Sequence, residues 1–316
     1  MKAFLVTGGA GFIGSNFIRY MMDKYSSYEI INLDLLTYAG NLKNVEEVAD
    51  LSRYHFVQGS INDRELVTNL VKQYKVDAII NFAAESHVDR SIEAAYPFVE
   101  TNVNGTLSLL EVAKKCQINR FVQISTDEVY GSLGLEGYFF EHSPLNPSSP
   151  YSASKASADL LVQSYHKTYG LDTIITRCSN NYGPYQHSEK LLPSIILKAF
   201  QNEKLPIYGE GQNVRDWLHV FDHCSAIDLA LHSGKSGEIY NIGAYHERTN
   251  NEMVDFIIGA LDREESLKEF IPDRLGHDFR YAIDSSKIRR ELKWQPKMDF
   301  DKSLIETIDW YITEQQ

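Results

Sequence analysis

The stretch AFLVTGGAGFIG, residues 3–14, joins a short apolar run to three glycines, Gly8, Gly11 and Gly14, at regular three-residue spacing. The apolar run predicts a buried β-strand, and the apolar positions from Phe12 onward predict a helix. Glycines between such a strand and helix permit a tight turn, close approach of the backbone to a pyrophosphate, and close helix packing. The amides of the helix N-terminus attract the phosphates. The stretch therefore predicts the first strand–helix unit of a dinucleotide-binding sheet.

A carboxylate ends the second predicted strand. The run Ile-Ile-Asn-Leu at residues 30–33 leads into Asp34, which lies 20 residues after Gly14. A carboxylate at this place binds ribose hydroxyls and would repel a 2′-phosphate. We therefore expect NAD+ rather than NADP+ as the cofactor.

Predicted strands and helices alternate from the N-terminus to the apolar run at residues 174–176. This alternation predicts an α/β fold, a Rossmann-type doubly wound parallel sheet with right-handed connections. The strict alternation fades after Arg177. We expect an NAD-binding domain over residues 1–177, to which segments near 214–245 return, and a smaller C-terminal substrate-binding lobe over most of residues 178–316.

Three polar side chains follow the apolar strand predicted at residues 121–124. They are Thr126, Asp127 and Glu128, and ligands of open α/β sheets bind at this carboxyl edge. Close carboxyl groups push their pKa values apart, so one can act as an acid and the other as a base. The alternative is an acid pair that merely stabilises a helix N-terminus through the helix dipole.

A tyrosine and a lysine stand four residues apart at Tyr151 and Lys155, which places both on one face of a predicted helix. A nearby ammonium group favours the phenolate, so we expect Lys155 to lower the pKa of Tyr151 and make it a base. The Ser- and Pro-rich loop between Glu128 and Tyr151 is too long for an ordinary connection, and we expect it to cover the site.

The composition excludes several classes of protein. The 316 residues include 31 basic and 43 acidic side chains, a net charge of −12, so we expect no nucleic-acid partner. The three cysteines have no metal-binding or redox spacing, and their odd number argues against a disulfide framework. No signal-peptide pattern begins the chain, and no apolar run approaches the roughly 18 residues of a membrane span. We expect a cytoplasmic protein without a metal site or a membrane partner.

With these residues in view, the chain resembles the extended short-chain dehydrogenase/reductases and, among them, the dTDP-glucose 4,6-dehydratase family. Consecutive Thr-Asp-Glu is the most specific feature, since epimerases of the superfamily lack the acid pair. Ser60 and Leu275 depart from the family's usual aspartate and proline, and the 128–151 loop is shorter than usual. The segments that carry the resemblance are residues 7–14, 34–41, 83–89, 126–128, Tyr151 with Lys155, 177–184, 213–217 and 273–278.

The resemblance implies conversion of dTDP-glucose to dTDP-4-keto-6-deoxyglucose plus water, with transient reduction of NAD+, in deoxysugar (rhamnose-type) biosynthesis. It implies that Tyr151 takes the 4-hydroxyl proton, that Lys155 lowers the tyrosine pKa and binds the ribose, and that Glu128 removes the C5 proton. Asp127 would protonate the departing 6-hydroxyl, and Thr126 would bind the 4-oxygen.

The expected NAD+ contacts are Gly8, Gly11, Phe12, Ile13, Gly14, Asp34, Leu35, Thr37, Ser60, Ile61, Ala83, Ala84, Thr101, Tyr151, Lys155 and Asn181. The expected contacts of the nucleotide sugar are Ser86, Thr126, Asn180, Lys190, Leu191, Pro206, Tyr208, Arg215, Asn250, Arg274 and His277. For the two arginines the alternative is a solvated surface charge. Pyrophosphate contact is favoured because the protein is acidic and its substrate is anionic.

Three other readings remain open at this point: a 4-epimerase, a dehydratase of another nucleotide sugar, and a non-catalytic NAD-binding protein. An epimerase needs neither a C5 base nor an acid that expels water, and a binding protein has no use for the tyrosine, lysine and acid pair together. We also expect a homodimer, on the family resemblance and on an apolar helix pair that carries Val103, Leu107, Leu160 and Leu161.

Overall fold

The computed structural model describes residues 2–314. Its centre is a seven-stranded sheet in the order β10-β6-β5-β4-β1-β2-β3, in which every neighbouring pair is parallel. The order reverses between β1 and β4, which is the arrangement of a doubly wound sheet. The strands are β1 (Lys2–Thr7), β2 (Tyr28–Asp34), β3 (Tyr54–Gln58), β4 (Ala78–Asn81), β5 (Arg120–Thr126), β6 (Thr173–Cys178) and β10 (Ile239–Ile242). The predicted α/β fold is confirmed.

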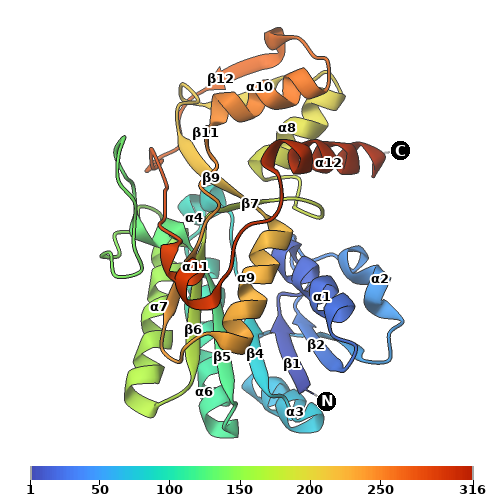
Figure 1. Cartoon of the computed structure of the whole chain (residues 1–316), viewed down its shortest axis with the longest axis vertical. Helices are drawn as coiled ribbons and strands as arrows, with labels where there is room; N and C mark the ends of the chain where they lie inside the picture. Colours follow the sequence, from blue (N-terminus) through green and yellow to red (C-terminus); the bar gives the residue numbers. More distant parts are fainter. Residues whose placement is uncertain (1, 315–316) are drawn as a thin grey trace.

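Helices cover both faces of this sheet (Figure 1). Successive residues of β1 point to opposite faces, so Phe4 and Val6 enter one core cluster and Leu5 enters another. The first cluster is closed by α1 (Phe12–Lys24), α9 (Val220–Ser233) and α11 (Ser286–Leu292). The second is closed by α3 (Arg64–Tyr74), α6 (Thr106–Cys116) and α7 (Pro150–Tyr169). The carboxyl edge of the strands is left for ligands.

Shorter helices occupy the connections. A π-helix over Val99–Gly105 continues directly as α6. The others are a 3₁₀-helix over Leu42–Val45, α2 (Glu46–Ala49), α4 (Val88–Glu93), α5 (Tyr96–Phe98) and a 3₁₀-helix over Asp127–Tyr130. The last of these carries the predicted acid pair directly after β5.

A smaller lobe lies above the carboxyl edge of the sheet in Figure 1. It has its own apolar core, to which Trp217, Leu304 and Ile257 belong. Its elements are β7 (Asn180–Tyr182), α8 (Leu191–Phe200), β8 (Leu205–Tyr208), β9 (Val214–His219), β11 (Glu247–Thr249), α10 (Asn250–Ala260), a 3₁₀-helix over Glu265–Leu267, β12 (Lys268–Ile271) and α12 (Phe300–Thr313). Strands β11, β9 and β7 form one sheet, and β12 with β8 forms another.

The chain passes several times between these two parts. Helix α9 and strand β10 follow the first strands of the smaller lobe in sequence, yet both belong to the large sheet and its core. Within residues 2–314, no helix is long and apolar enough to cross a membrane.

Candidate active site

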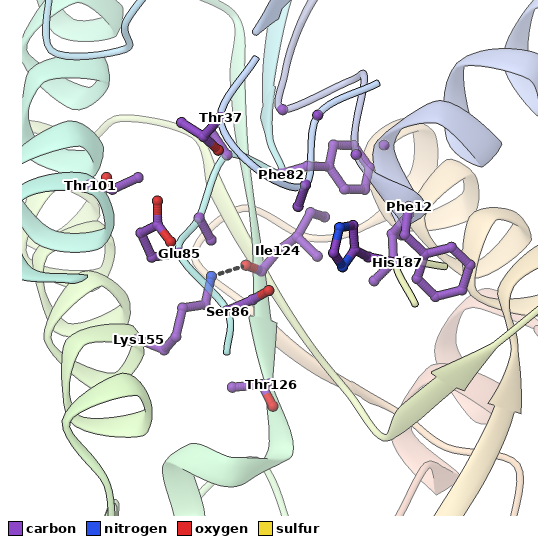
Figure 2. Close-up of a pocket in the computed structure, with 18 of the residues that line it drawn as sticks. Phe12, Thr37, Phe82, Glu85, Ser86, Thr101, Ile124, Thr126, Lys155 and His187 are labelled. Carbon is purple, nitrogen blue, oxygen red and sulfur yellow. Dashed lines mark hydrogen bonds between the residues drawn. The ribbon is translucent and has the colours of Figure 1, made fainter. Parts of the chain in front are cut away.

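A cavity of about 320 Å³ opens at the carboxyl edge of the large sheet. Its walls come from the loops that follow β1, β2, β4, β5 and β6 and from the start of α7, so distant parts of the sequence meet there (Figure 2). Among the predicted site residues, those that line it are Gly8, Gly11, Phe12, Ile13, Gly14, Asp34, Leu35, Thr37, Ser60, Ile61, Ala83, Ala84, Ser86, Thr101, Thr126, Asp127, Glu128, Tyr151, Lys155, Asn180, Asn181 and Lys190.

The glycine loop allows no side chain at its tightest points. Gly8 has a positive φ of 69°, and a Cβ atom there would lie 2.6 Å from the backbone nitrogen of Ala83. A Cβ on Gly14 would collide with the carbonyl oxygen of Gly8. Helix α1 then begins after Gly11 without a capping side chain, which leaves its first amides open to a ligand. This loop fits the close approach of a pyrophosphate.

The carboxylate of Asp34 is held in place at the end of β2. It accepts hydrogen bonds from the backbone amides of Ala10, at 2.9 Å, and Leu36, at 2.8 Å. These bonds tie the glycine loop to the second strand and fix the carboxylate against the cavity wall. The position suits the ribose contact that the sequence predicts.

Thr126, Asp127 and Glu128 follow β5 without interruption. The hydroxyl of Thr126 accepts a hydrogen bond from the Glu128 amide at 3.2 Å and lies 3.3 Å from Oδ1 of Asp127, to which it donates. Asp127 is 2 % exposed, and its Oδ2 has no hydrogen-bond partner among residues 2–314. The 3₁₀-helix that these acids begin has only four residues, so its dipole gives little reason for burying the carboxyl group of Asp127.

The two carboxyl groups differ in their surroundings. Burial raises the pKa of Asp127 well above its usual value, and the carboxylates of Glu128 and Asp216 raise it further. Burial also raises the pKa of Glu128, but Arg215 and Lys190 oppose that rise. Asp127 is therefore the better proton donor, and Glu128 is the better base.

Tyr151 and Lys155 lie in the first turns of α7, where a capping box between Ser149 and Ser152 fixes the start of the helix. Nζ of Lys155 donates a hydrogen bond to the carbonyl oxygen of Ile124 at 2.7 Å, so the lysine is anchored to β5 (Figure 2). Both side chains are buried.

The prediction that the pKa of Tyr151 is lowered is wrong for the protein without its cofactor. Burial raises the pKa of this phenol well above its usual value, and the charge of Glu128 adds to the rise. Burial also lowers the pKa of the Lys155 ammonium. The sequence pattern shows the lysine beside the tyrosine, but it does not show how deeply both groups are buried or that carboxylates surround the phenol.

Seven predicted substrate contacts do not line this cavity: Leu191, Pro206, Tyr208, Arg215, Asn250, Arg274 and His277. They belong to the smaller lobe or to the segment that follows β12. The charges of Arg215 and Arg274 nevertheless reach Glu128, whose pKa both of them lower. Lys190, which does line the cavity, donates from Nζ to the carbonyl oxygen of Ser86 at 2.7 Å and so links the lobe to the large sheet.

Four of these side chains have hydrogen-bond partners within the described residues: Tyr208, Arg215, Arg274 and His277. Arg215 donates to the backbone carbonyl oxygens of Val214, Asp278 and Phe279, and its guanidinium lies 4.3 Å from the ring centre of Tyr281. It is buried, so the alternative of a solvated surface charge is wrong for this arginine. His277 is hydrogen-bonded to Asp273 at 2.6 Å.

The loop between the acid pair and Tyr151 does not cover the cavity. None of residues 131–149 lines it. The amides of Leu133 and Phe139 instead donate to the carbonyl oxygens of Arg280 and Ala282, and Glu141 accepts from the amide of Asn241 on the edge strand β10. The prediction of a cover was therefore wrong, because this segment finds its backbone partners along residues 280–284 and at the edge of the sheet.

Sequence reasoning missed several lining residues. Most of them adjoin a predicted residue, so the position of ligands at the carboxyl edge of the sheet could have found them, but Gln186 and His187 carry no such signal. The missed residues are Leu33, Ala39, Gly40, Gly59, Asn62, Phe82, Glu85, Ile124, Ser125, Cys178, Ser179, Gln186, His187 and Glu189.

Comparisons with known proteins agree with this geometry. Residues 5–307 match the family model described as GDP-mannose 4,6 dehydratase. A relative from Xanthomonas campestris pv. campestris (strain B100), named dTDP-glucose 4,6-dehydratase, is 49 % identical over 333 residues, which cover 100 % of this chain and 94 % of the relative.

Solved structures give the same picture. The dTDP-glucose 4,6-dehydratase of Bacillus anthracis in complex with NAD is 52 % identical, with a TM-score of 0.94 over 100 % of this chain and 98 % of that one. DesIV of Streptomyces venezuelae, a dTDP-glucose 4,6-dehydratase with NAD and TYD bound, is 49 % identical, with a TM-score of 0.97 over 99 % and 98 %. A UDP-glucose 4-epimerase of Thermotoga maritima with UDP-glucose is 27 % identical, with a TM-score of 0.92 over 99 % and 100 %. The fold is thus shared by dehydratases and epimerases.

Proposed function

The chain belongs to the nucleotide-sugar 4,6-dehydratase family, and from this premise we propose that it is an NAD-dependent dTDP-glucose 4,6-dehydratase. It is a lyase that converts dTDP-glucose to dTDP-4-keto-6-deoxyglucose and water. Relatives that are about half identical over almost the whole chain carry this name. The function does not rest on the fold, which epimerases share.

One observation carries the proposal: an acid pair and a tyrosine–lysine pair line the same cavity. An oxidation at C4 needs one base, whereas elimination of water needs a second base and an acid. Tyr151, Glu128 and Asp127 supply these three groups, and the surroundings of the two carboxyls separate their pKa values in the direction that the roles require.

The residues that would hold NAD+ fit it. Gly8, Gly11 and Gly14 leave room for its pyrophosphate, and Asp34 suits an unphosphorylated ribose. When bound, NAD+ accepts a hydride from the sugar, returns it, and brings a positive charge on its ring. A positive charge near the phenol would lower the raised pKa of Tyr151.

The side chains then act in sequence on the sugar. Tyr151 takes the proton of the 4-hydroxyl as the C4 hydride departs, while Thr126 binds the 4-oxygen and Lys155 holds the ribose and favours the phenolate. The resulting ketone acidifies the C5 proton, which Glu128 removes. Asp127 protonates the 6-hydroxyl, so that water leaves C6. Return of the hydride to C6 and of a proton to C5 gives the product.

The division of labour between the two parts of the chain is proposed as follows. Residues 1–177, with α9 and β10, bind the cofactor and carry the catalytic groups, and most of residues 178–316 binds the nucleotide. The contacts proposed for dTDP are Leu191, Pro206, Tyr208, Arg215, Asn250, Arg274 and His277, with Ser86, Asn180 and Lys190 nearer the sugar. The pKa effect of Arg215 and Arg274 on Glu128 supports a place for the diphosphate beside the acid pair.

We also propose that the enzyme is a homodimer. Leu107 and Leu161 are partly buried against the second core cluster, so they offer a partner only part of their surface. Leu160 on α7 is 57 % exposed, however, and Tyr96 in the neighbouring α5 is 76 % exposed. Burial of these apolar side chains against a second copy would form a two-fold interface.

Turnover with different nucleotide sugars tests the proposed function. The purified enzyme is incubated separately with dTDP-glucose, UDP-glucose and GDP-mannose, and the products are analysed by mass spectrometry. We expect loss of one water with a kcat/KM highest for dTDP-glucose. Unchanged mass with a new epimer would make the protein an epimerase, and loss of water from another sugar alone would change the substrate. If the protein binds NAD but converts none of the three sugars, it is a non-catalytic NAD-binding protein.

A further inference from the structure

A buried histidine outside the cavity contacts a side chain that lines it. Asn181 on β7 is 8 % exposed and faces the cavity, whereas His223 on α9 is fully buried and does not line it. Oδ1 of Asn181 lies 2.8 Å from Nδ1 of His223, and its Nδ2 donates to the carbonyl oxygen of Ser179 at 2.9 Å. Both ends of the amide are therefore held by the protein.

These contacts fix which atoms carry hydrogen. The Ser179 carbonyl only accepts, so the amide nitrogen of Asn181 must face it and the amide oxygen must face the histidine. His223 must then donate from Nδ1. Burial lowers the pKa of His223 to about 3, so the ring stays neutral with its hydrogen on Nδ1. One hydrogen of the Asn181 amide nitrogen remains free for a ligand.

Helix α9 is well suited to hold this ring still. It packs against α1, β6 and β7, the same elements that carry the glycine loop and the end of β6. A second bond, from Nε2 of Gln186 to the backbone carbonyl of Asn181 at 3.0 Å, fixes the main chain beside the amide. The orientation of Asn181 is thus set from behind the cavity rather than from within it.

We propose that His223 is a positioning residue for the cofactor site, which orients the Asn181 amide so that its free N–H binds an oxygen of NAD+. This inference rests on the proposed function, because it takes NAD+ as the ligand. In this role the hydrogen bond between His223 and Asn181 affects the affinity for NAD+, and His223 takes no part in the reaction of the sugar. Since the ring is neutral, its contribution to NAD+ affinity should not change with pH near neutrality.

The test compares two substitutions of the histidine by direct NAD+ binding in a calorimeter, without sugar. His223→Leu removes the donor and leaves the Asn181 oxygen buried without it, and we expect NAD+ binding to weaken about five- to hundredfold. His223→Asn places an amide nitrogen near the position of Nδ1, and we expect affinity within about threefold of wild type. If the leucine variant does not fold, His223→Gln serves instead, because its longer side chain puts the donor near Nε2 and affinity should fall similarly.

A second comparison separates positioning from general stability. In an Asn181→Ala background, His223→Leu should cause no additional loss of NAD+ affinity, because the amide that it orients is gone. His219 is the matched control: it is buried at the start of the same helix, and its Nδ1 accepts from the Phe221 amide rather than from a cavity residue. His219→Asn should leave NAD+ affinity unchanged.

The outcomes distinguish this inference from the proposed function. Wild-type protein that does not bind NAD+ would overturn the proposed function itself. Wild-type binding with unchanged affinity in His223→Leu, or equal losses in the presence and absence of Asn181, would overturn the role of His223 alone. A loss of affinity that His223→Asn restores and that disappears in the Asn181→Ala background supports it.

Discussion

Arg274 holds the carboxylate of Asp89 with two hydrogen bonds: Nε lies 2.5 Å from Oδ1, and Nη2 lies 2.8 Å from Oδ2. Asp89 belongs to α4 beside the large sheet, whereas Arg274 lies in the loop after β12 of the smaller lobe. The pair therefore spans the two parts of the protein. Arg274 is also one of the residues that we assign to binding the diphosphate of the substrate.

Substitution of Asp89 tests whether the substrate competes for this arginine. Asp89→Asn removes the carboxylate that occupies Arg274, and we expect KM for dTDP-glucose to fall about two- to fivefold, because the pair is partly exposed and its attraction is modest. Initial rates at increasing salt measure this effect, which should shrink as charges are screened. A higher KM would mean instead that Asp89 positions Arg274 for the substrate.

Substitution of Glu128 should separate oxidation from elimination. Glu128→Gln keeps the shape of the side chain but removes the C5 base, so we expect turnover to fall about 10²- to 10⁴-fold. The 4-hydroxyl would still be oxidised, and absorbance of the reduced nicotinamide should rise by one equivalent per site and persist. Full turnover in this variant would contradict the assignment of Glu128 as the base.

The pH dependence of kcat follows from the two carboxyl groups. Activity requires Glu128 ionised and Asp127 protonated, so activity falls as the pH drops through the pKa of Glu128 and as it rises through that of Asp127. Burial raises both pKa values, and that of Asp127 well above the usual range, which leaves a window between the two limbs. Asp127→Asn should lower kcat about 10²- to 10⁴-fold and remove the alkaline limb that belongs to Asp127. An unchanged alkaline limb would assign it to another group.

A charged side chain on α7 tests the proposed dimer. Leu160→Glu places a carboxylate in the proposed interface, where its desolvation opposes association, and light scattering should give the molar mass of a single chain. Leu135→Glu is the control, because Leu135 is 82 % exposed in the loop before α7 and should leave the dimer intact. A dimer that persists in Leu160→Glu would place the interface elsewhere.

The sequence was informative wherever a local pattern carries the chemistry. The glycine loop, Asp34 and the acid pair after β5 could all be assigned because strand ends in a parallel sheet meet at one edge. The i, i+4 spacing likewise placed Tyr151 and Lys155 on one helix face at the cavity.

Features that depend on tertiary contacts were not predictable in this way. Arg274 and Asp89 are 185 residues apart, and His223 and Asn181 are 42 apart, so no local pattern joins them. The sign of the Tyr151 pKa shift depends on burial depth, which the spacing to Lys155 does not show. The 131–149 loop was misjudged for a similar reason, because its partners at residues 280–284 come from the far end of the chain.

The central claim is that the hydride removed from C4 of the sugar returns to C6 of the same sugar. The most direct test uses dTDP-glucose with deuterium at C4, and the position of the label in the product is read by NMR. We predict deuterium at C6 of a 4-keto-6-deoxy product, with none released to solvent. Deuterium that remains at C4 of an epimerised sugar, or that is lost to water, would contradict the account.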